Sequence, residues 1–364
     1  SRSPYDRFRA RKKALSVTDL VSNIWCEQQF EYTLVRGFRR RTPEMARGSA
    51  VHKVLEDQVH TTVPVEPTTK EDHWGLKLFN MYQGMQSLKE QGLTRELPVF
   101  GFFGDIFVRG IIDEISYVNP RDRPGADVEL PEMKMKRGRR NQSYAPDTSS
   151  AEAPTVDDAL ELIIESETFE VPERGKRMAF LSDTKTRASR SYPRASQARA
   201  TSIQLMLYRR LLANLHSGEV DLTKACELFE LDIGARLSDS FIAEIAGLDH
   251  NLPVEKLLAH NSLRGMWQLV SESMKESVDT ISDVMGVSYR LQSDGSMIGL
   301  KTFDHDDQVV DVHLEEALAW WKGERSTVGV EIEEAWKCRY CEFEQECTWR
   351  LGKIEDMKRR REEA

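Results

Sequence analysis

Residues 180–187, with the sequence Phe-Leu-Ser-Asp-Thr-Lys-Thr-Arg, place two opposite charges at the end of an apolar run. This run predicts a buried strand, and the period of two along a strand puts Asp183 and Lys185 on one face. The carboxylate can hold a divalent cation that polarises a phosphate, and the ammonium can orient an attacking water or help to deprotonate it. Taken alone, such a pair is more typical of a solvated strand surface, so the interpretation depends on its neighbours.

Two other segments add polar residues that can reach the same site. Residues 108–115 predict a strand that carries a second carboxylate, Asp113. Residues 201–212 predict an amphipathic helix, on which Gln204 and Tyr208 lie one turn apart. We therefore expect both segments to contribute to one site.

A third segment predicts a helix that begins with Thr42 as its cap. Gly48, His52 and Glu56 recur at every fourth residue, which places them in one stripe on that helix. The stripe offers an imidazole and a carboxylate to the same site. Glu56 is equally well interpreted as a residue that takes no part in catalysis.

The remaining pattern predicts an α/β core. Residues 96–103 and 106–118 predict a hairpin that delivers Asp113, with Glu96 as an accessory carboxylate. Residues 225–233 predict a further strand in which Cys226 packs as a small hydrophobe. Other elements expected from periodicity are helices over 74–88, 240–275 and 311–322 and an extended stretch over 289–304.

The composition of the 364-residue chain is that of a soluble globular protein, with 40% hydrophobic and 30% charged residues. No uninterrupted run of about 18 apolar residues occurs, which argues against a membrane span, and no signal peptide opens the chain. We expect an intracellular protein. The chain begins at Ser1 rather than Met, so we also expect that a native N-terminal extension with any targeting signal has been removed.

Basic residues are clustered although the net charge is −9. Residues 184–218 contain no acidic residue and seven Lys or Arg residues, and another basic cluster precedes the helix of His52. Such runs favour an acidic partner such as DNA, although a solvated basic surface is the alternative. The candidate DNA-binding residues are Arg39, Arg40, Arg187, Arg190, Arg194 and Arg199.

The order of these motifs resembles the RecB-like branch of the PD-(D/E)XK nuclease superfamily. The resemblance is carried by Gly48, His52 and Glu56, then Gly-Ile-Ile-Asp113, Asp183-x-Lys185 and Gln204-x-x-x-Tyr208. Within that branch, residues 16–20 (Ser-Val-Thr-Asp-Leu), 184–187 and 204–208, with four dispersed cysteines, resemble the exonuclease V family from about residue 16 to 351. Many relatives carry Glu in place of Asp183, but both are hard oxygen ligands suited to magnesium.

The resemblance implies a PD-(D/E)XK core, a mixed central sheet flanked by helices, with helical elaborations and a cysteine-ligated cluster joining the two ends of the chain. It also implies a magnesium-dependent exonuclease, with Mn²⁺ as a substitute, that degrades single-stranded DNA from strand ends in repair or genome maintenance. The catalytic set expected from it is Asp113, Asp183, Lys185, His52, Gln204 and Tyr208. Asp113, Asp183 and His52 would bind magnesium, and Lys185 would position the water.

Three cysteines, Cys338, Cys341 and Cys347, form a C-x2-C-x5-C cluster near the end of the chain. Cys26 can supply a fourth ligand, and the family resemblance assigns it that role. Four thiolates suit structural zinc or an iron–sulfur cluster, and the resemblance favours 4Fe-4S. A disulfide is the structural alternative, but the C-x2-C spacing in an intracellular protein argues against it.

We expect one nuclease domain over residues 16–351, preceded by a flexible basic arm over 1–15 and followed by a charged tail over 352–364. Residues 120–177 predict a partly disordered insertion, and 338–347 hold the cysteines. We expect a monomer, with single-stranded DNA as substrate and a single-strand-binding protein as a possible partner. The resemblance favours a mitochondrial location, with the nucleus as the alternative.

Two rival functions remain. One is a catalytically weak nucleic-acid-binding protein whose cysteines hold structural zinc. The absence of Asp113, Asp183 or Lys185 would favour this function, but all three residues are present. The other is the nuclease subunit of a helicase–nuclease complex. The chain contains no G-x-x-x-x-G-K-[ST] motif, so unwinding would have to come from another chain.

Overall fold

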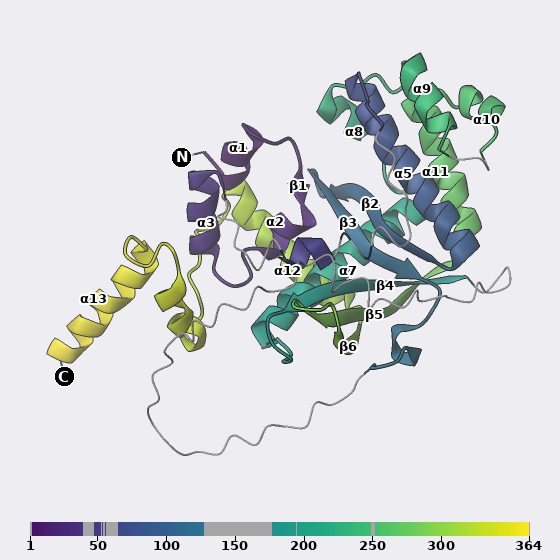
Figure 1. The fold of residues 1–364 in the computed structure, drawn as a ribbon. Helices are drawn as coiled ribbons and strands as arrows, with labels where there is room; N and C mark the ends of the chain where they lie inside the picture. Colours follow the sequence, from purple (N-terminus) through teal and green to yellow (C-terminus); the bar gives the residue numbers. More distant parts are fainter. Residues whose placement is uncertain are drawn as a thin grey trace, which may run out of the picture.

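The computed structural model describes residues 2–38, 47–51, 53, 55, 65–126, 177–193, 195–248 and 252–363 (Figure 1). Some predictions fall outside these residues and remain predictions. They concern His52, Glu56, Arg39, Arg40, Arg194 and most of the predicted insertion.

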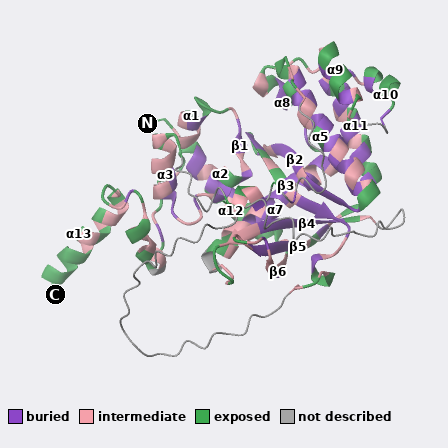
Figure 2. Cartoon of the chain, viewed as in Figure 1, coloured by how far each residue is buried: buried purple, intermediate pink, exposed green. Residues whose placement is uncertain are grey.

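A six-stranded mixed sheet lies at the centre of the molecule, as predicted. Its strands are β1 (Leu15–Ser16), β2 (Leu93–Phe103), β3 (Ile106–Ser116), β4 (Met178–Arg187), β5 (Thr280–Leu291) and β6 (Met297–Asp304). The strand order is β1-β3-β4-β5-β6, and β2, which lies outside this path, also pairs with β3. β4 and β5 are parallel, whereas β3 pairs antiparallel with both β2 and β4. The strands are largely buried, which explains their long apolar runs (Figure 2).

The hairpin of β2 and β3 is confirmed and brings Asp113 into the sheet. Gly104 makes the turn with φ +62°, a left-handed conformation that glycine adopts without strain. β3 then runs past β4 in the register Glu114 to Ser182, next to the Asp183-x-Lys185 motif. The hairpin therefore places both carboxylates in adjacent strands.

Two groups of helices cover the sheet (Figure 1). The long helix α7 (Ala195–Ser217) contacts β2, β3, β4 and β5. A separate helical layer packs against β2 through α5 (Lys70–Gln91). That layer also contains α8 (Leu222–Phe229), α9 (Asp239–Ala246), α10 (Val254–Ala259) and α11 (Leu263–Ser277).

Asp72 joins two helices of that layer. It completes a capping box with Thr69 at the start of α5 and accepts hydrogen bonds from the backbone N–H and hydroxyl of Ser238, the cap of α9. Burial opposes the ionisation of Asp72, but the hydrogen bonds from Ser238, Thr69 and Thr68 outweigh it and hold its pKa at about 2.

We expect Asp72→Asn to destabilise the protein by about 2 kcal/mol at pH 7. The reason is that hydrogen bonds in the folded state stabilise the ionised carboxylate, and the unfolded state lacks these hydrogen bonds. The lowered folded pKa means that this stabilisation is present above the ordinary carboxyl pKa and is lost as pH falls through about 2. Urea unfolding of both proteins should show the difference shrinking to about half at pH 3. A difference that does not change with pH would assign the effect to packing instead.

The N-terminal region is not an unpacked arm throughout. Residues Pro4–Arg9 form the helix α1, capped by Ser3, and Phe8 is buried with its ring 5.3 Å from that of Trp321. This segment differs from the predicted flexible arm, because Phe8 is buried in the core and Tyr5 packs against the same core. Of the predicted tail, residues up to Glu362 belong to α13 (Thr348–Glu362), a helix with no buried residue that projects from the body (Figure 1).

The N- and C-terminal regions pack together. Their helices are α2 (Val17–Val21), α3 (Glu27–Arg36) and α12 (Asp307–Lys322), with a 3-10 helix at Ile332–Tyr340. Another 3-10 helix, Pro120–Asp122, follows β3 and contacts β5 and β6. Phe30 of α3 lies against Trp320 and Trp321 of α12, with ring centroids 5.7 and 5.8 Å apart. No helix in the described part of the chain is long and apolar enough to cross a bilayer.

Other predictions about individual elements need correction. Residues 225–233 are not a strand: Cys226 is buried on α8, where Leu222, Ala225, Cys226 and Phe229 recur with helical spacing. Asp221 caps this helix by accepting hydrogen bonds from the N–H groups of Thr223 and Lys224. The helix expected over 240–275 is divided into α9, α10 and α11.

Candidate active site

The Asp183-x-Lys185 motif lies on β4, as predicted, with both side chains on one face. The ammonium of Lys185 donates a hydrogen bond to the carboxylate of Asp183 at 2.9 Å. Asp183 is buried, whereas Lys185 is partly exposed. Burial works against the charge on Lys185, but Asp183 and Asp113 outweigh it and raise the pKa of the ammonium. Lys185 therefore carries a positive charge within the site.

Asp113 on β3 lies beside this pair. Its carboxylate accepts a hydrogen bond of 3.1 Å from the backbone N–H of Thr184 and lies close to the carboxyl group of Asp183. Burial raises the pKa of Asp113, partly offset by Lys185. Two adjacent carboxyl groups and one ammonium thus meet where β3 and β4 pair.

Glu96 lies opposite Asp113 in the β2–β3 ladder, between the pairs Arg95–Glu114 and Leu97–Ile112. Its charge raises the pKa of Asp113. Glu96 has φ +51°, a left-handed conformation that costs a non-glycine residue about 1 kcal/mol or more and is concentrated at functional sites. Sequence reasoning classed Glu96 as an accessory carboxylate, and the ladder register puts it close to the site.

The helix α7 brings Gln204 and Tyr208 to the same place, as their spacing predicts. The side-chain oxygen of Gln204 accepts a hydrogen bond of 3.5 Å from Lys185, and its amide donates one of 3.3 Å to the hydroxyl of Tyr208. Burial is the main cause that raises the pKa of Tyr208 to about 12, so the phenol is neutral near pH 7. A chain of contacts therefore runs from Asp183 through Lys185 and Gln204 to Tyr208.

Gly110 belongs to the predicted Gly-Ile-Ile-Asp113 motif, but its contact with Tyr208 was not expected from the sequence. It lies within β3, and a Cβ atom there would be 2.3 Å from Cε1 of Tyr208 and 3.2 Å from Val17. The missing side chain lets the Tyr208 ring lie against the strand. A glycine three residues before a carboxylate within a strand pattern is the signal that could have indicated this close approach.

We expect Gly110→Ala to reduce nuclease activity by roughly tenfold to a hundredfold and to lower stability by about 1–3 kcal/mol, because the new methyl group must displace the Tyr208 ring. Steady-state kinetics and urea unfolding would measure both effects. Gly352→Ala is the matched control, since a Cβ at this position of α13 meets no atom within 4 Å. Unchanged activity in Gly110→Ala would show that the position of Tyr208 is unimportant.

The described part of the predicted His52 helix borders β4. Residues 47–51, 53 and 55 are helical, and a Cβ on Gly48 would lie 3.1 Å from Oγ1 of Thr186. The carbonyl of Leu55 accepts a hydrogen bond of 2.6 Å from Arg95. Arg95 in turn pairs with the buried Glu114 at 3.2 Å. These contacts hold the helix against the strand pair that carries Asp113.

The arginines of the acid-free run have different partners. Arg209 pairs with Asp283 at 2.6 Å, and Arg210 pairs with Asp307 and Asp311 of α12. Arg190 is exposed after β4 and donates a hydrogen bond of 2.8 Å to Ser296. The positive charge of this run, which contains no acidic residue, is thus partly neutralised by acidic residues from other parts of the chain.

All four predicted ligand cysteines line one small cavity, although they come from opposite ends of the chain. Cys26 caps α3, and the others follow α12. Burial raises the pKa of Cys26, and the proximity of Cys347 and Cys338 raises it further. Four thiols around one cavity are the donor types that zinc and iron–sulfur centres use.

Polar contacts join the same two regions. Glu27 of α3 pairs with Arg325 at 2.5 Å and accepts a hydrogen bond of 2.9 Å from the N–H of Val328. Tyr32 lies 5.3 Å from Phe343 between ring centroids and accepts a hydrogen bond from the N–H of Thr348. The cavity is therefore enclosed by segments that also bind each other directly.

Neither centre is a complete metal site within the part of the chain that the structure describes. No group of three or more His, Cys, Asp or Glu side chains there is arranged to hold a metal ion. Asp113 and Asp183 supply two oxygen donors, and His52, the third predicted ligand, lies outside the described residues. The carboxylate pair suits a hard cation such as magnesium.

Comparisons with known proteins identify related sequences. A family model described as exonuclease V, a 5′ deoxyribonuclease, matches residues 3–350. Exonuclease V of Danio rerio is 28% identical over 357 residues, which cover 97% of this chain and 74% of the fish protein. Mitochondrial exonuclease V of Candida albicans (strain WO-1) is 26% identical over 116 residues, 31% of this chain and 19% of that protein. The protein of that name from Candida dubliniensis is 26% identical over 110 residues, 29% of this chain and 17% of its own length.

The sheet brings the Asp183–Lys185 pair beside Asp113, and Lys185 contacts Gln204, which in turn contacts Tyr208. The family model matches nearly the whole length of the chain, so the chain belongs to the exonuclease V family and is a nuclease that hydrolyses DNA.

Proposed function

We propose that this chain is a magnesium-dependent 5′ exonuclease that prefers single-stranded DNA. The observation that carries the proposal is the contact chain from Asp113 and Asp183 through Lys185 to Gln204, on three different elements of the fold. The family description supports the 5′ polarity and the DNA substrate. The preference for single strands and the use of magnesium are proposals.

The carboxylates of Asp113 and Asp183, with His52, would hold the metal. A bound magnesium ion would polarise the scissile phosphate and lower the pKa of its water. Lys185, held as an ammonium by the two carboxylates, orients the attacking water and offsets negative charge. Gln204 positions Lys185, and Tyr208 positions Gln204. Glu96 acts as an accessory carboxylate across the β2–β3 ladder.

We further propose that Cys26, Cys338, Cys341 and Cys347 hold a 4Fe-4S cluster. Their arrangement around one cavity supports this, and four thiols would suit zinc equally well. Such a cluster would join the ends of the chain, which already meet through Glu27 and Tyr32.

Candidate phosphate contacts remain Arg39, Arg40, Arg187, Arg190, Arg194 and Arg199. The names of the two Candida relatives support a mitochondrial location, and a role in DNA repair is part of the same proposal.

The test is digestion of single strands labelled at the 5′ or the 3′ end, with circular single strands, duplex DNA and single-stranded RNA alongside. We expect magnesium-dependent release of label from the 5′ end of linear single-stranded DNA, with little cleavage of circles. Equal cleavage of circles would indicate an endonuclease, and a preference for duplex DNA would contradict the proposed substrate. Binding without cleavage in magnesium or manganese would support the catalytically weak alternative.

A further inference from the structure

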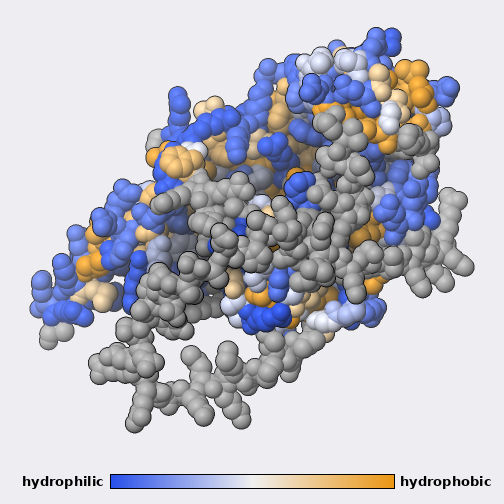
Figure 3. Space-filling model, viewed as in Figure 1, coloured by the Kyte–Doolittle hydropathy of each residue, from blue (hydrophilic) through white to orange (hydrophobic). Residues whose placement is uncertain are grey.

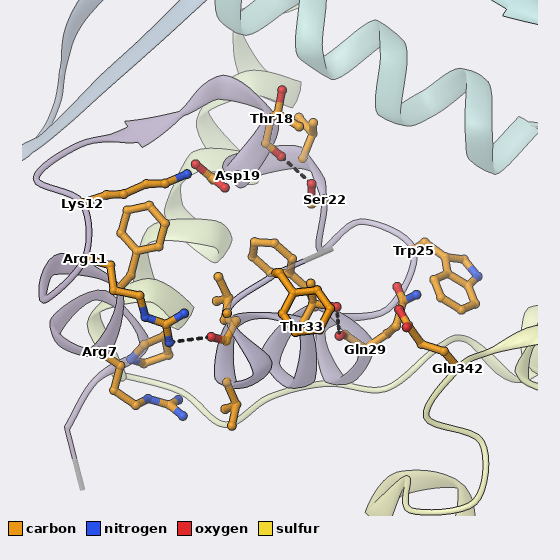
Figure 4. A pocket seen from close by; sticks show the side chains of 18 of the residues that line it. Arg7, Arg11, Lys12, Thr18, Asp19, Ser22, Trp25, Gln29, Thr33 and Glu342 are labelled. Atoms are coloured by element: carbon orange, nitrogen blue, oxygen red, sulfur yellow. Dashed lines mark hydrogen bonds between the residues drawn. The ribbon is translucent and has the colours of Figure 1, made fainter. Parts of the chain in front are cut away.

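A cavity of about 970 Å³ lies between the N-terminal helices and the start of α7 (Figure 4). Arg7, Arg11 and Lys12 lie on one side of it in this view, and Trp25 and Glu342 lie on the other. Its volume is near the upper end for ligand pockets, so it has room for more than one nucleotide. None of the described residues of the proposed catalytic set lines this cavity.

The cavity is positively charged although the protein is acidic. Five of its lining residues are Lys or Arg and two are acidic. Of the acids, Asp19 accepts hydrogen bonds from Ser16, and Glu342 pairs with Arg36 at 2.5 Å. Two of the basic residues pair with acids outside the lining, Arg7 with Glu31 at 2.9 Å and Lys337 with Glu334 at 2.6 Å. Three basic residues, Arg2, Arg11 and Lys12, therefore remain in the lining against one acidic residue, Asp19.

Two of the basic residues are available to an anion. Arg11 donates a hydrogen bond of 2.8 Å to the carbonyl of Leu34, which leaves its charge uncompensated, and Lys12 lies 5.8 Å from the ring centroid of Phe8. Neither forms an ion pair with any acidic group that the structure describes. Both side chains are exposed at the cavity.

Aromatic and aliphatic side chains complete the lining. Trp25 and Phe38 both border the cavity, and Phe38 is 64% exposed. Val21 and Leu34 add apolar surface. Basic groups combined with aromatic faces are typical of sites for single-stranded nucleic acid, because every base can stack on an aromatic ring while cations bind the backbone. Exposed apolar residues also occur on α10, where Val254 is 48% and Leu258 is 52% exposed. Figure 3 shows that apolar and polar areas alternate over this face of the molecule.

Helix α7 connects this cavity to the candidate active site. Gln197 and Ala200 line the cavity, and Gln204 and Tyr208 belong to the site. Spacings of three, four and four residues place all four on one face of the helix. From Gln197 to Gln204 the axis advances by about 10 Å at about 1.5 Å per residue, a distance of a few nucleotides of a strand. A strand that leaves the site along this face enters the cavity.

We propose that this cavity binds the single-stranded DNA substrate beyond the scissile phosphate. The inference rests on the proposed nuclease function and adds the path of the strand. Arg11 and Lys12 bind its phosphates, and its bases stack on Phe38 and Trp25.

The test is binding of fluorescent oligothymidylates of about 4 and about 16 nucleotides to the full chain, in calcium to prevent cleavage. Wild type should bind the longer strand more tightly. We expect Arg11→Gln with Lys12→Gln to raise the Kd of the longer strand roughly tenfold and to reduce the salt dependence by about 1.4 logarithmic units per decade, about 0.7 for each lost phosphate contact. Phe38→Ala should weaken the longer strand with little change in salt dependence.

The matched control is Lys256→Gln with Lys275→Gln, which removes two exposed charges from α10 and α11. This control should keep the wild-type ratio of the two Kd values. An equal loss in the control, or wild-type length and salt dependence in the Arg11 and Lys12 variant, would overturn the proposal. If wild type cleaves no DNA, the proposed function fails instead, and the two failures are distinguishable.

A measurement on wild-type protein guards against misfolded variants. A single strand carrying iodouracil, irradiated in the complex, should cross-link to the peptide of Trp25 or Phe38. Cross-links found only on α9 or α10 would place the strand on the opposite helical layer and overturn the proposal.

Discussion

Asp183→Asn is expected to reduce cleavage of single-stranded DNA roughly a thousandfold or more, because the amide keeps the shape of the carboxylate but lacks its charge. Asp183 is 2% exposed, and its carboxylate holds the ammonium of Lys185 at 2.9 Å. The substitution therefore removes both a metal donor and the partner that positions Lys185. Single-turnover kinetics would measure the loss, and fluorescence anisotropy should show DNA binding largely retained.

Asp239→Asn is the matched control for this experiment. Asp239 is an exposed residue in the first turn of α9, so its loss should change stability by less than about 1 kcal/mol and leave cleavage intact. Lys185→Ala should share the loss seen in Asp183→Asn, since the two side chains act as a pair. Near-normal turnover in either variant would remove β4 from the proposed mechanism.

If the proposed 4Fe-4S cluster is present, the purified protein should be brown and contain about four iron atoms per chain, and Cys26→Ser is expected to eliminate both because one thiolate ligand is lost. Iron and sulfide analysis, visible absorbance and limited proteolysis would measure the effect. Proteolysis should increase near both ends, since the cluster joins α3 to the segment after α12. DNA degradation should also fall, although Asp113 and Asp183 are unchanged.

Cys226→Ala is the matched control, because Cys226 is buried on α8 as a small apolar residue away from the cavity of the other cysteines. It should retain full iron content. A colourless wild-type protein with one tightly bound zinc would contradict the iron assignment, but the proposal that a metal centre joins the two ends of the chain would stand. Wild-type metal content in Cys26→Ser would show that Cys26 is not a ligand.

Much of the fold and of the site followed from local patterns. The period of two placed Asp183 and Lys185 on one face, and the spacing of four placed Gln204 and Tyr208 in contact. The hairpin that carries Asp113 is of the same kind. These features depend on residues close in sequence, so propensity and periodicity are sufficient to predict them.

Local patterns failed where apolar spacing was ambiguous. Residues 225–233 were predicted as a strand because short apolar windows suit both structures, and packing of Cys226 against the helical layer favours the helix α8. The basic N-terminal stretch was predicted to be unpacked, yet burial of Phe8 against Trp321 orders α1. In both cases the partner surface lies far away in sequence.

The sequence by itself therefore determined the catalytic residue types, their order and their spacing within elements. Only the tertiary structure decided which basic side chains remain available to bind DNA phosphates. Arg209 and Arg210 form ion pairs with acidic residues of β5 and α12. Arg11 and Lys12 line a cavity and form no ion pair with any acidic group among the described residues. It also decided that Glu96 lies across from Asp113 and that Cys26 reaches the C-terminal cysteines. The physical reason is that charge pairing and thiol proximity depend on distances in space between strands and helices, which the sequence specifies only through the packing of the whole core.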